Sequence, residues 1–206
     1  MRLRTRLFLT LFIFVAVYGT GSAQDSTATR DLSWKRKGFI DAGVYIANPG
    51  SKSYVSQSYS LNPGFQLAFS GYLFPKVLFG VRYVQFSGSI TDRQLAGDYD
   101  RTNFQTFGIQ LGYDIATINR FNFVLNACVG ATTYRNKKEG AQNFIDNGTS
   151  LHINPQVNVE LLDWLAVYVM PEWRIDYMNT RVPPDLEDLF GTLNYINISA
   201  GVHLKF

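Results

Sequence analysis

The 206-residue sequence is poor in charged residues, histidine and cysteine. Asp, Glu, Lys and Arg make up 17% of it, and it has two histidines and one cysteine. The single cysteine, Cys128, has no partner for a disulfide within the chain. No His/Cys/Asp cluster has the spacing of metal ligands, so we expect neither a metal site nor a cofactor. The longest apolar stretch, residues 7–18, is shorter than the about 20 residues that a membrane-spanning helix needs.

The few basic residues are unevenly placed, and the first of them form a leader. Arg2, Arg4 and Arg6 precede the apolar stretch, and small residues including Gly21 and Ala23 follow it. A basic start, a short apolar segment and small residues before the cut are typical of a secretory signal peptide. We therefore predict a signal peptide over residues 1–23 in preference to a membrane anchor.

Removal of this leader changes the charge balance of the protein. Three of the 19 basic residues leave with it, so 16 basic residues face 16 acidic ones and the sequence pI of 8.9 no longer describes the mature chain. A neutral chain without a basic face excludes an electrostatic nucleic-acid binder. The polar residues 24–36 are expected to be a periplasmic lead-in.

The rest of the chain alternates between apolar and polar residues with a period of two, which is the pattern of β-strands with two different faces. At the C-terminus, for example, Ile196, Ile198 and Ala200 alternate with Asn197 and Ser199. The alternation predicts eight strands, in residues 38–47, 64–74, 77–86, 103–114, 120–134, 150–161, 164–177 and 196–206.

The connections between these strands alternate in length. Those at Pro75–Lys76, 115–119 and Asp163 are short, whereas 48–62, 87–102, 135–149 and 178–194 are long and rich in turn residues. Strands of about 9–12 residues joined in this way are typical of an up-and-down barrel. The prediction for residues 37–206 is an all-β fold, an eight-stranded antiparallel up-and-down transmembrane β-barrel.

The distribution of charge favours a membrane barrel over a soluble lipocalin-like carrier. The apolar face of the predicted strands has no Asp, Glu, Lys or Arg, and a charged side chain on a lipid-facing strand costs about 2–4 kcal/mol at the midplane. The charges lie on the other, inward face, and buried charges have to be paired. We expect an interior charge network of Asp41, Arg82, Glu160, Glu172, Arg174, Asp176 and Lys205.

In its leader, eight strands, alternating connections and terminal Phe206, the chain resembles the small bacterial outer-membrane β-barrel family, including OmpX-like and PorT-like proteins of the Bacteroidota type. The resemblance implies a place in the cell outer membrane, in contact with lipid and lipopolysaccharide. It also implies that Phe206, Leu204 and Val202 form a signal by which the barrel assembly machinery recognises the chain for insertion.

Nothing in the sequence predicts catalysis. His152 and His203 have inward parity and are expected at opposite ends of the barrel. Some barrels that hydrolyse lipid A carry a His and a Ser two residues apart on one strand, but neither histidine here is followed by such a serine. We therefore expect a closed polar interior and a non-enzymatic role in envelope structure, surface recognition or a larger machine. The alternatives are a narrow small-solute channel, a lipid A-modifying hydrolase and a lipocalin-like carrier.

Two further features lead to specific expectations. Pro155 and Pro171 have outward parity within predicted strands and fall opposite each other if the hairpin is centred on Asp163; we expect a kink or bulge there, because proline removes a ladder hydrogen bond. In the last long connection, Leu186, Leu189 and Phe190 have helical spacing, and their apolar side chains on a polar rim predict a contact with a protein partner.

Overall fold

The computed structural model describes residues 38–206 apart from 52, 139, 141 and 181–186. The predicted signal peptide, the predicted lead-in and Leu186 lie outside the described residues. The described strands are β1 (Gly38–Ile46), β2 (Tyr59–Phe74), β3 (Val77–Ile90), β4 (Arg101–Ile118), β5 (Phe121–Lys137), β6 (Phe144–Leu162), β7 (Leu165–Met178) and β8 (Thr192–Lys205), and the described helices are α2 (Tyr54–Ser58), α3 (Arg93–Ala96) and α4 (Glu187–Phe190).

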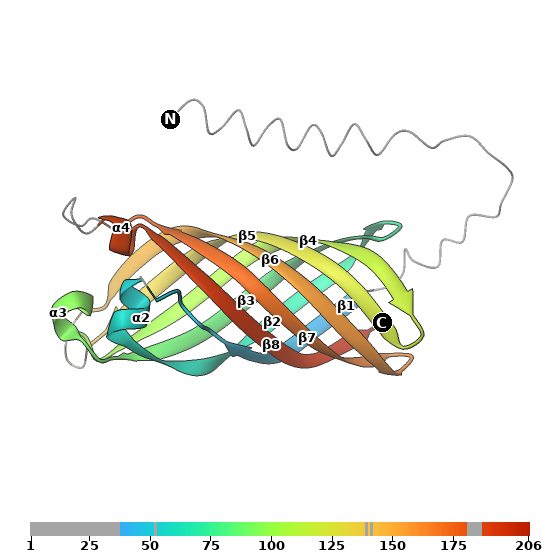
Figure 1. Cartoon of the computed structure of the whole chain (residues 1–206), viewed down its shortest axis with the longest axis horizontal. Coiled ribbons are helices and arrows are strands. Elements are labelled where there is room, and N and C mark those ends of the chain that lie inside the picture. Colours follow the sequence, from blue (N-terminus) through green and yellow to red (C-terminus); the bar gives the residue numbers. More distant parts are fainter. Residues whose placement is uncertain (1–37, 52, 139, 141, 181–186) are drawn as a thin grey trace, which may run out of the picture. The chain divides into compact units, whose positions relative to one another are not determined.

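The eight strands form one closed antiparallel barrel in which each strand pairs with its neighbours in sequence and β1 pairs with β8 (Figure 1). The predicted fold class is therefore confirmed. The closing pair runs from Phe39 opposite Lys205 to Ile46 opposite Ile198. None of the described helices is long and apolar enough to cross a membrane.

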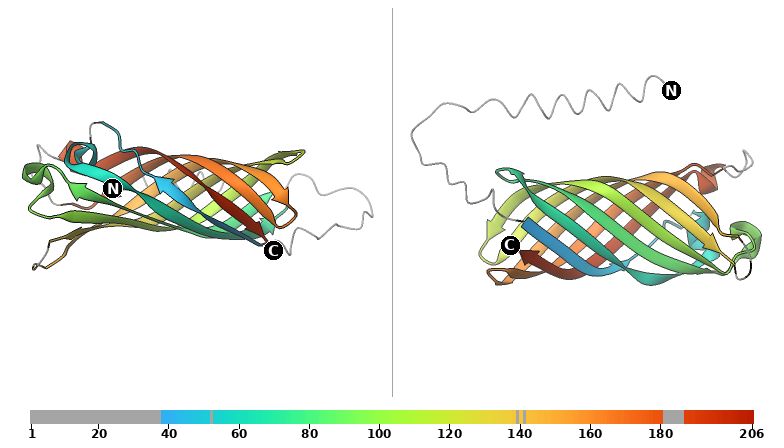
Figure 2. Two further views of the ribbon diagram at one scale, coloured as in Figure 1. Left: turned by 90° about the horizontal axis from the view of Figure 1, so that it is seen from below. Right: turned by 180° about the vertical axis from the view of Figure 1, so that it is seen from behind.

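The two ends of the barrel differ. Short turns join β2 to β3, β4 to β5 and β6 to β7 at one end, which we call the turn end. Lys76 and Asn119 have positive φ values of 67° and 54° in the first two of these turns, as tight hairpin turns often require. The longer connections, with α2, α3 and α4, gather at the opposite end, the loop end (Figure 2).

Most strands are longer than the alternation predicts, and they extend toward the loop end. β6 begins at Phe144 instead of residue 150, and β5 continues to Lys137. In these extensions the outward residues are mostly polar, as Arg135 and Asn147 are, with Ile145 as an exception. Because most residues on both faces of the strand are then polar, the period-two signal weakens and the sequence resembles a loop.

The two prolines lie opposite each other as expected, but the register shows no bulge between them. Ile153 pairs with Trp173 and Val157 with Val169, so the register stays constant across the region and places Pro155 opposite Pro171, while the three residue pairs between these positions are missing from the ladder. A proline has no N–H to donate. The prolines thus interrupt the β6–β7 ladder without shifting it, and the shift in this hairpin lies between Glu160 and Leu162.

The barrel has a polar interior and an apolar exterior. Side chains with outward parity around its middle, such as Val81, Ile109, Val129, Val169 and Ile198, are exposed. The inward positions between them hold buried Arg, Glu, Asp, Asn and Gln residues. This is the reverse of a soluble protein, in which exposed positions are mostly polar.

Candidate functional site

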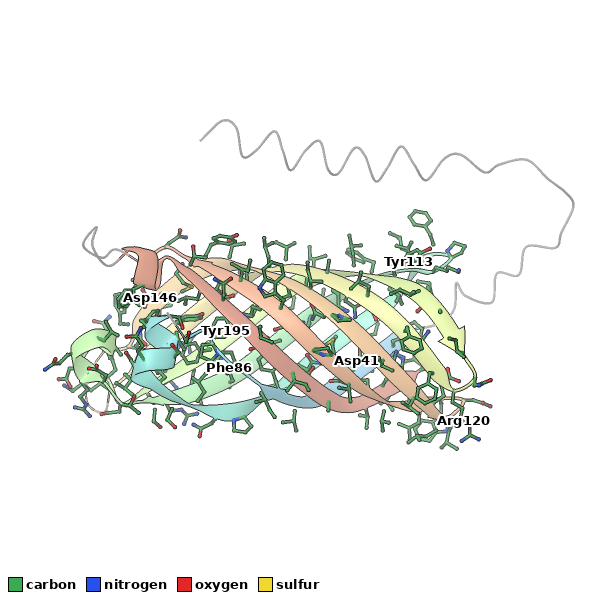
Figure 3. All side chains as sticks on the ribbon, in the orientation of Figure 1. Asp41, Phe86, Tyr113, Arg120, Asp146 and Tyr195 are labelled. Atoms are coloured by element: carbon green, nitrogen blue, oxygen red, sulfur yellow. The ribbon has the colours of Figure 1, made fainter. Side chains whose placement is uncertain are left out.

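The interior of the barrel changes in character from one end to the other, and three layers can be distinguished. Figure 3 shows Phe86 and Tyr195 inside the barrel toward the loop end, and Asp41 inside it toward the turn end. Between these regions lie the buried arginines Arg82 and Arg174 with their acidic partners.

The loop-end layer is an aromatic cluster. Its buried residues are Tyr45, Tyr54, Val55, Tyr59, Val84, Phe86, Phe104, Tyr134, Met178, Leu193 and Tyr195. The rings of Phe86 and Phe104 stack at 4.7 Å. Helix α2 contributes Tyr54 and Val55, and it is capped by Ser53, whose Oγ accepts a hydrogen bond of 3.2 Å from the Ser56 N–H. Burial raises the pKa of the Tyr54 hydroxyl well above its ordinary value, so this group stays protonated.

The middle layer is organised around Glu172, which is almost fully buried. Arg82 Nη1 donates to its Oε2 at 2.5 Å, and Asn154 Nδ2 donates to the same oxygen at 3.1 Å. The other oxygen, Oε1, accepts hydrogen bonds from Tyr45 Oη at 2.5 Å and from Asn197 Nδ2 at 2.8 Å. Both oxygens of the carboxylate are therefore occupied by the protein itself.

A second ion pair lies next to this one. Arg174 makes a bidentate contact with Asp176 through Nε at 2.8 Å and Nη2 at 2.7 Å. The guanidinium carbon also lies 5.3 Å from the centre of the Tyr195 ring and 5.8 Å from that of Phe86, within cation–π range. The middle layer thus contains two arginines and two acids, which neutralise each other.

The remaining residues of the predicted interior network lie at the turn end. Asp41 Oδ1 lies 2.6 Å from His203 Nδ1, and Lys205 pairs with Glu160. Asp41 therefore pairs with a histidine that lies outside the predicted network. Six of the seven predicted residues form three ion pairs with one another, and Asp41 pairs with His203, so the residues form separate local pairs and not one connected network.

The structure brings together one constellation that the sequence analysis misses. His152 Nε2 lies 3.0 Å from Ser150 Oγ, and His152 Nδ1 lies 3.1 Å from Glu172 Oε2. The serine two residues away stands before the histidine in the sequence, as Ser150, and not after it. Residues two apart on a strand share a face, so a search in both directions would have found it.

The geometry of this group does not provide a working Ser–His–acid relay. The contact between His152 Nδ1 and Glu172 is too poorly aligned for a hydrogen bond, and a relay needs the acid to orient the imidazole. Ser150 is fully buried, and neither Ser150 nor His152 lines the turn-end cavity described next. The serine side chain is therefore not exposed to solvent in this conformation.

At the turn end the interior opens into a cavity of about 260 Å³. Its lining is mostly polar: Asp41, Ser70, Gln110, Asp114, Thr117, Asn122, Asn126, Gln156, Asn158, Glu160, His203 and Lys205, with Phe39, Tyr72, Leu78 and Val124 as the apolar part. The described residues contain no group of three or more His, Cys, Asp or Glu side chains that could hold a metal ion.

The outer surface bears an apolar belt with a polar band above it. The belt contains the exposed Phe65, Phe79, Phe107, Val167 and Val202, and no outward position within it is charged. Toward the loop end the outward residues of β4 and β5 become polar. There Arg101 pairs directly with Lys137, and Arg135 lies opposite Asn103.

The predicted insertion signal lies at the end of the closing strand. Val202 and Phe206 are exposed on the outside, and Leu204 is half-buried. The backbone of Phe206 pairs with that of Gly38 through hydrogen bonds of 2.7 and 3.0 Å. These side chains are accessible on the outside of the barrel near its turn end.

The predicted partner contact is partly covered by the protein. Leu189 and Phe190 are half-buried and pack against the aromatic cluster, and the Phe190 ring stacks on Tyr54 at 4.3 Å. These two side chains therefore have intramolecular partners. The contact with another protein stays a prediction.

The connections at the loop end also contain a small ion-pair group. Asp98 contacts Arg93 Nη1 at 2.9 Å and also accepts a hydrogen bond from Lys138, while Arg93 Nη2 reaches Asp100 at 2.9 Å. The hydrogen bond from Lys138 and its positive charge lower the pKa of the exposed Asp98 carboxyl. This group links α3 to the end of β5.

The fold is similar to those of several solved outer-membrane proteins. The structure is similar to that of Neisserial surface protein A, with a TM-score of 0.55 and 18% identity over 82% of this chain and 97% of that one. It is also similar to the outer membrane protein OprG from Pseudomonas aeruginosa, with a TM-score of 0.57 and 12% identity over 82% and 95%. The chain has the fold of the small outer-membrane β-barrels.

A third neighbour is the outer membrane protein AlkL, determined in lipid bilayers, with a TM-score of 0.54 and 8% identity over 89% of this chain and 96% of that one. No protein-family model and no curated protein matches the sequence. The shared fold and the apolar belt support the predicted outer-membrane location. The narrower resemblance to PorT-like proteins of the Bacteroidota stays a prediction.

Proposed function

We propose that the protein is a non-conducting, non-enzymatic outer-membrane barrel that presents its loop end at the cell surface and contacts lipopolysaccharide through its rim. The observation that carries this proposal is the filled interior. The aromatic cluster and the two buried ion pairs occupy successive layers, and an eight-stranded barrel is only wide enough to be filled by its own side chains.

The filled interior argues against a small-solute channel. Planar bilayers containing the refolded protein should show no stable single-channel steps, with heat-modifiable migration on gels as the check that the barrel is folded. Steps that persist in several preparations would overturn the proposal. They would mean that the central and aromatic layers move aside.

The burial of Ser150 argues against a lipid A hydrolase. A serine-reactive fluorophosphonate should leave the folded protein unlabelled, and the lipid A mass profile of a deletion strain should equal that of its parent. Labelling that disappears in Ser150→Ala, together with a shifted lipid A profile, would instead assign an acyl-hydrolase activity to the Ser150–His152 pair.

The apolar belt argues against a lipocalin-like carrier. Such a carrier would have a hydrated exterior and an apolar interior, and here the inward positions of the middle layer are charged.

In the outer membrane the short turns face the periplasm and the longer connections face outward. The turn end is then periplasmic and the loop end external.

The contact with lipopolysaccharide is supported by the polar band above the belt. Arg101 and Lys137 are directly opposite on neighbouring strands, and like charges in this position repel each other. An anionic group between them would remove the repulsion, and the phosphates of an outer-leaflet glycolipid lie at the border of the apolar belt. External protein partners and recognition by the barrel assembly machinery are further parts of this proposal.

A further inference from the structure

The turn-end cavity has features of a ligand site that the closed-barrel function does not use. Farther toward the middle of the barrel, the inward residues Gln66 of β2 and Arg82 of β3 are almost fully buried. The cavity is therefore closed on that side. Its volume of about 260 Å³ equals the space of about eight or nine water molecules at about 30 Å³ each. A ligand with a comparable number of heavy atoms fits this space.

The charges that line the cavity are mostly negative. Asp41, Asp114 and Glu160 face Lys205 and His203. Lys205 is paired with Glu160, and His203 with Asp41. Asp114 accepts hydrogen bonds from the neutral groups Tyr72 Oη and Asn122 Nδ2, and no described basic side chain lies within ion-pair distance of it. Its negative charge is therefore not balanced by a described ion pair.

The amide side chains in the cavity donate to one another in a chain. Gln110 Nε2 donates to Asn126 at 3.3 Å, Asn126 Nδ2 to Gln156 at 3.0 Å, and Gln156 Nε2 to Asn158 at 2.8 Å. Asn158 Nδ2 donates to Asn122 at 2.9 Å, and Asn122 in turn donates to Asp114. This series of hydrogen bonds begins at Gln110 and ends at the carboxylate of Asp114.

Gln110 leaves an acceptor without a partner. The residue is 5% exposed, it lines the cavity, and its Oε1 atom has no hydrogen-bond partner. A buried carbonyl oxygen without a donor costs about 1–3 kcal/mol. A donor that reached this oxygen would remove the cost, and the carboxylate of Asp114 favours a donor with positive charge.

The apolar part of the lining fits an organic cation. Phe39 packs against Tyr72 with ring centres 5.4 Å apart and stacks on His203 at 5.0 Å, so two aromatic rings and an imidazole form one side of the cavity. Aromatic faces attract alkylammonium groups. The lack of a metal-ligand group among the described residues argues against a bare divalent ion.

We propose that the turn-end cavity binds a small organic cation with a primary ammonium group, held by Asp114 and Gln110 Oε1 against the Phe39 and Tyr72 rings. If the turn end is periplasmic, the ligand comes from the periplasm. The proposal does not depend on what the loop end contacts or on whether the barrel conducts.

The test is calorimetric titration of the full mature chain, folded in detergent, with 1,4-diaminobutane. Two compounds of the same length, neutral 1,4-butanediol and anionic succinate, are titrated in parallel. We expect one saturable site for the diamine and none for the other two. Equal binding of the diol, equal competition by Mg²⁺, or no saturable binding of the diamine at millimolar concentration would each overturn the proposal.

Variants locate the site. Asp114→Asn should weaken diamine binding about tenfold or more, the effect of losing a hydrogen bond to a charged group, and Gln110→Leu should weaken it severalfold. Asp163→Asn removes an exposed carboxylate from the β6–β7 turn at the same end and should leave binding unchanged. Heat-modifiable migration shows that each variant is folded. Unchanged binding in folded Asp114→Asn and Gln110→Leu would contradict the assignment.

Discussion

Arg82 and Glu172 form an ion pair inside the barrel, with Arg82 Nη1 2.5 Å from Glu172 Oε2 and both side chains only 1% exposed. The two residues come from β3 and β7, which are not adjacent in the barrel, so the pair bridges its interior. Gln66, Tyr45, Asn154 and Asn197 complete the hydrogen bonds of the two charged groups. The pair is therefore part of the packing that closes the barrel.

Removal of one partner should be costly. Glu172→Gln leaves the buried Arg82 charge without its acid, and breaking a buried pair in this way destabilises a protein by about 3–5 kcal/mol. We expect a lower urea midpoint for the folded form on gels. Asp163→Asn is the control for a lost surface carboxylate. The double variant Arg82→Met/Glu172→Leu, which leaves no unpaired charge, should recover part of the loss. A midpoint for Glu172→Gln equal to that of the control would contradict this role.

The two opposed prolines weaken the β6–β7 contact. Replacing both in Pro155→Val/Pro171→Val supplies the missing N–H groups, and because the register is already constant, the ladder can close without a shift. With about 0.5–1.5 kcal/mol for each hydrogen bond gained, the double variant should unfold at a higher urea concentration than the parent. Val129→Ile is a control for a change of outward apolar surface. A less stable double variant would show that the interruption relieves strain.

The rim site predicts a salt-dependent affinity for lipopolysaccharide. A basic residue near an anionic membrane surface contributes about 1 kcal/mol, so Arg101→Gln or Lys137→Gln should each weaken binding about fivefold and reduce its salt dependence. Lys76→Gln removes an exposed lysine at the other end of the barrel and is the matched control. The measurement is binding of lipopolysaccharide to detergent-solubilised protein. Equal losses in all three variants would mean a general effect of charge without a rim site.

The Asp98 group makes a prediction about pH. Because the pKa of Asp98 is lower in the folded protein than in the unfolded chain, its contacts with Lys138 and Arg93 contribute above the ordinary carboxyl pKa and are lost as pH falls through the lowered value. NMR titration of the Asp98 carboxyl should give a midpoint below the ordinary value of an aspartate. Asp98→Asn should change global stability little, since exposed pairs contribute little. A midpoint at or above the ordinary aspartate value would contradict the contact.

The fold could be predicted from the sequence because one physical requirement acts at nearly every position of the belt. An outward residue such as Ile109 has to suit lipid and an inward one such as Gln110 does not, so the alternation itself reveals the strands. Above the belt this requirement ends, so the alternation does not reveal the extension of β6 to Phe144. Parity also assigned Arg82 and Glu172 to the interior, but it contains no information about height or rotamer, so it could not predict that Asp41 contacts His203.

Two other features required coordinates. The turn-end cavity depends on which inward side chains are too short to meet, and no spacing in the sequence expresses this. Ser150 could have been found, because its distance of two residues from His152 is visible in the sequence. The burial of Ser150 and His152 and the poor alignment of His152 with Glu172 could not have been found from the sequence.

The most direct test of the account is a comparison of a lipid-facing and a rim position by spin labelling. In a Cys128→Ser background, a nitroxide at Ile109 in the belt should collide with oxygen far more than with a water-soluble nickel complex, and a nitroxide at Arg101 should show the opposite preference in the same membranes. Heat-modifiable migration shows that the labelled barrels are folded. A label at Ile109 that is freely accessible to the nickel complex would contradict a barrel whose apolar face lies in lipid.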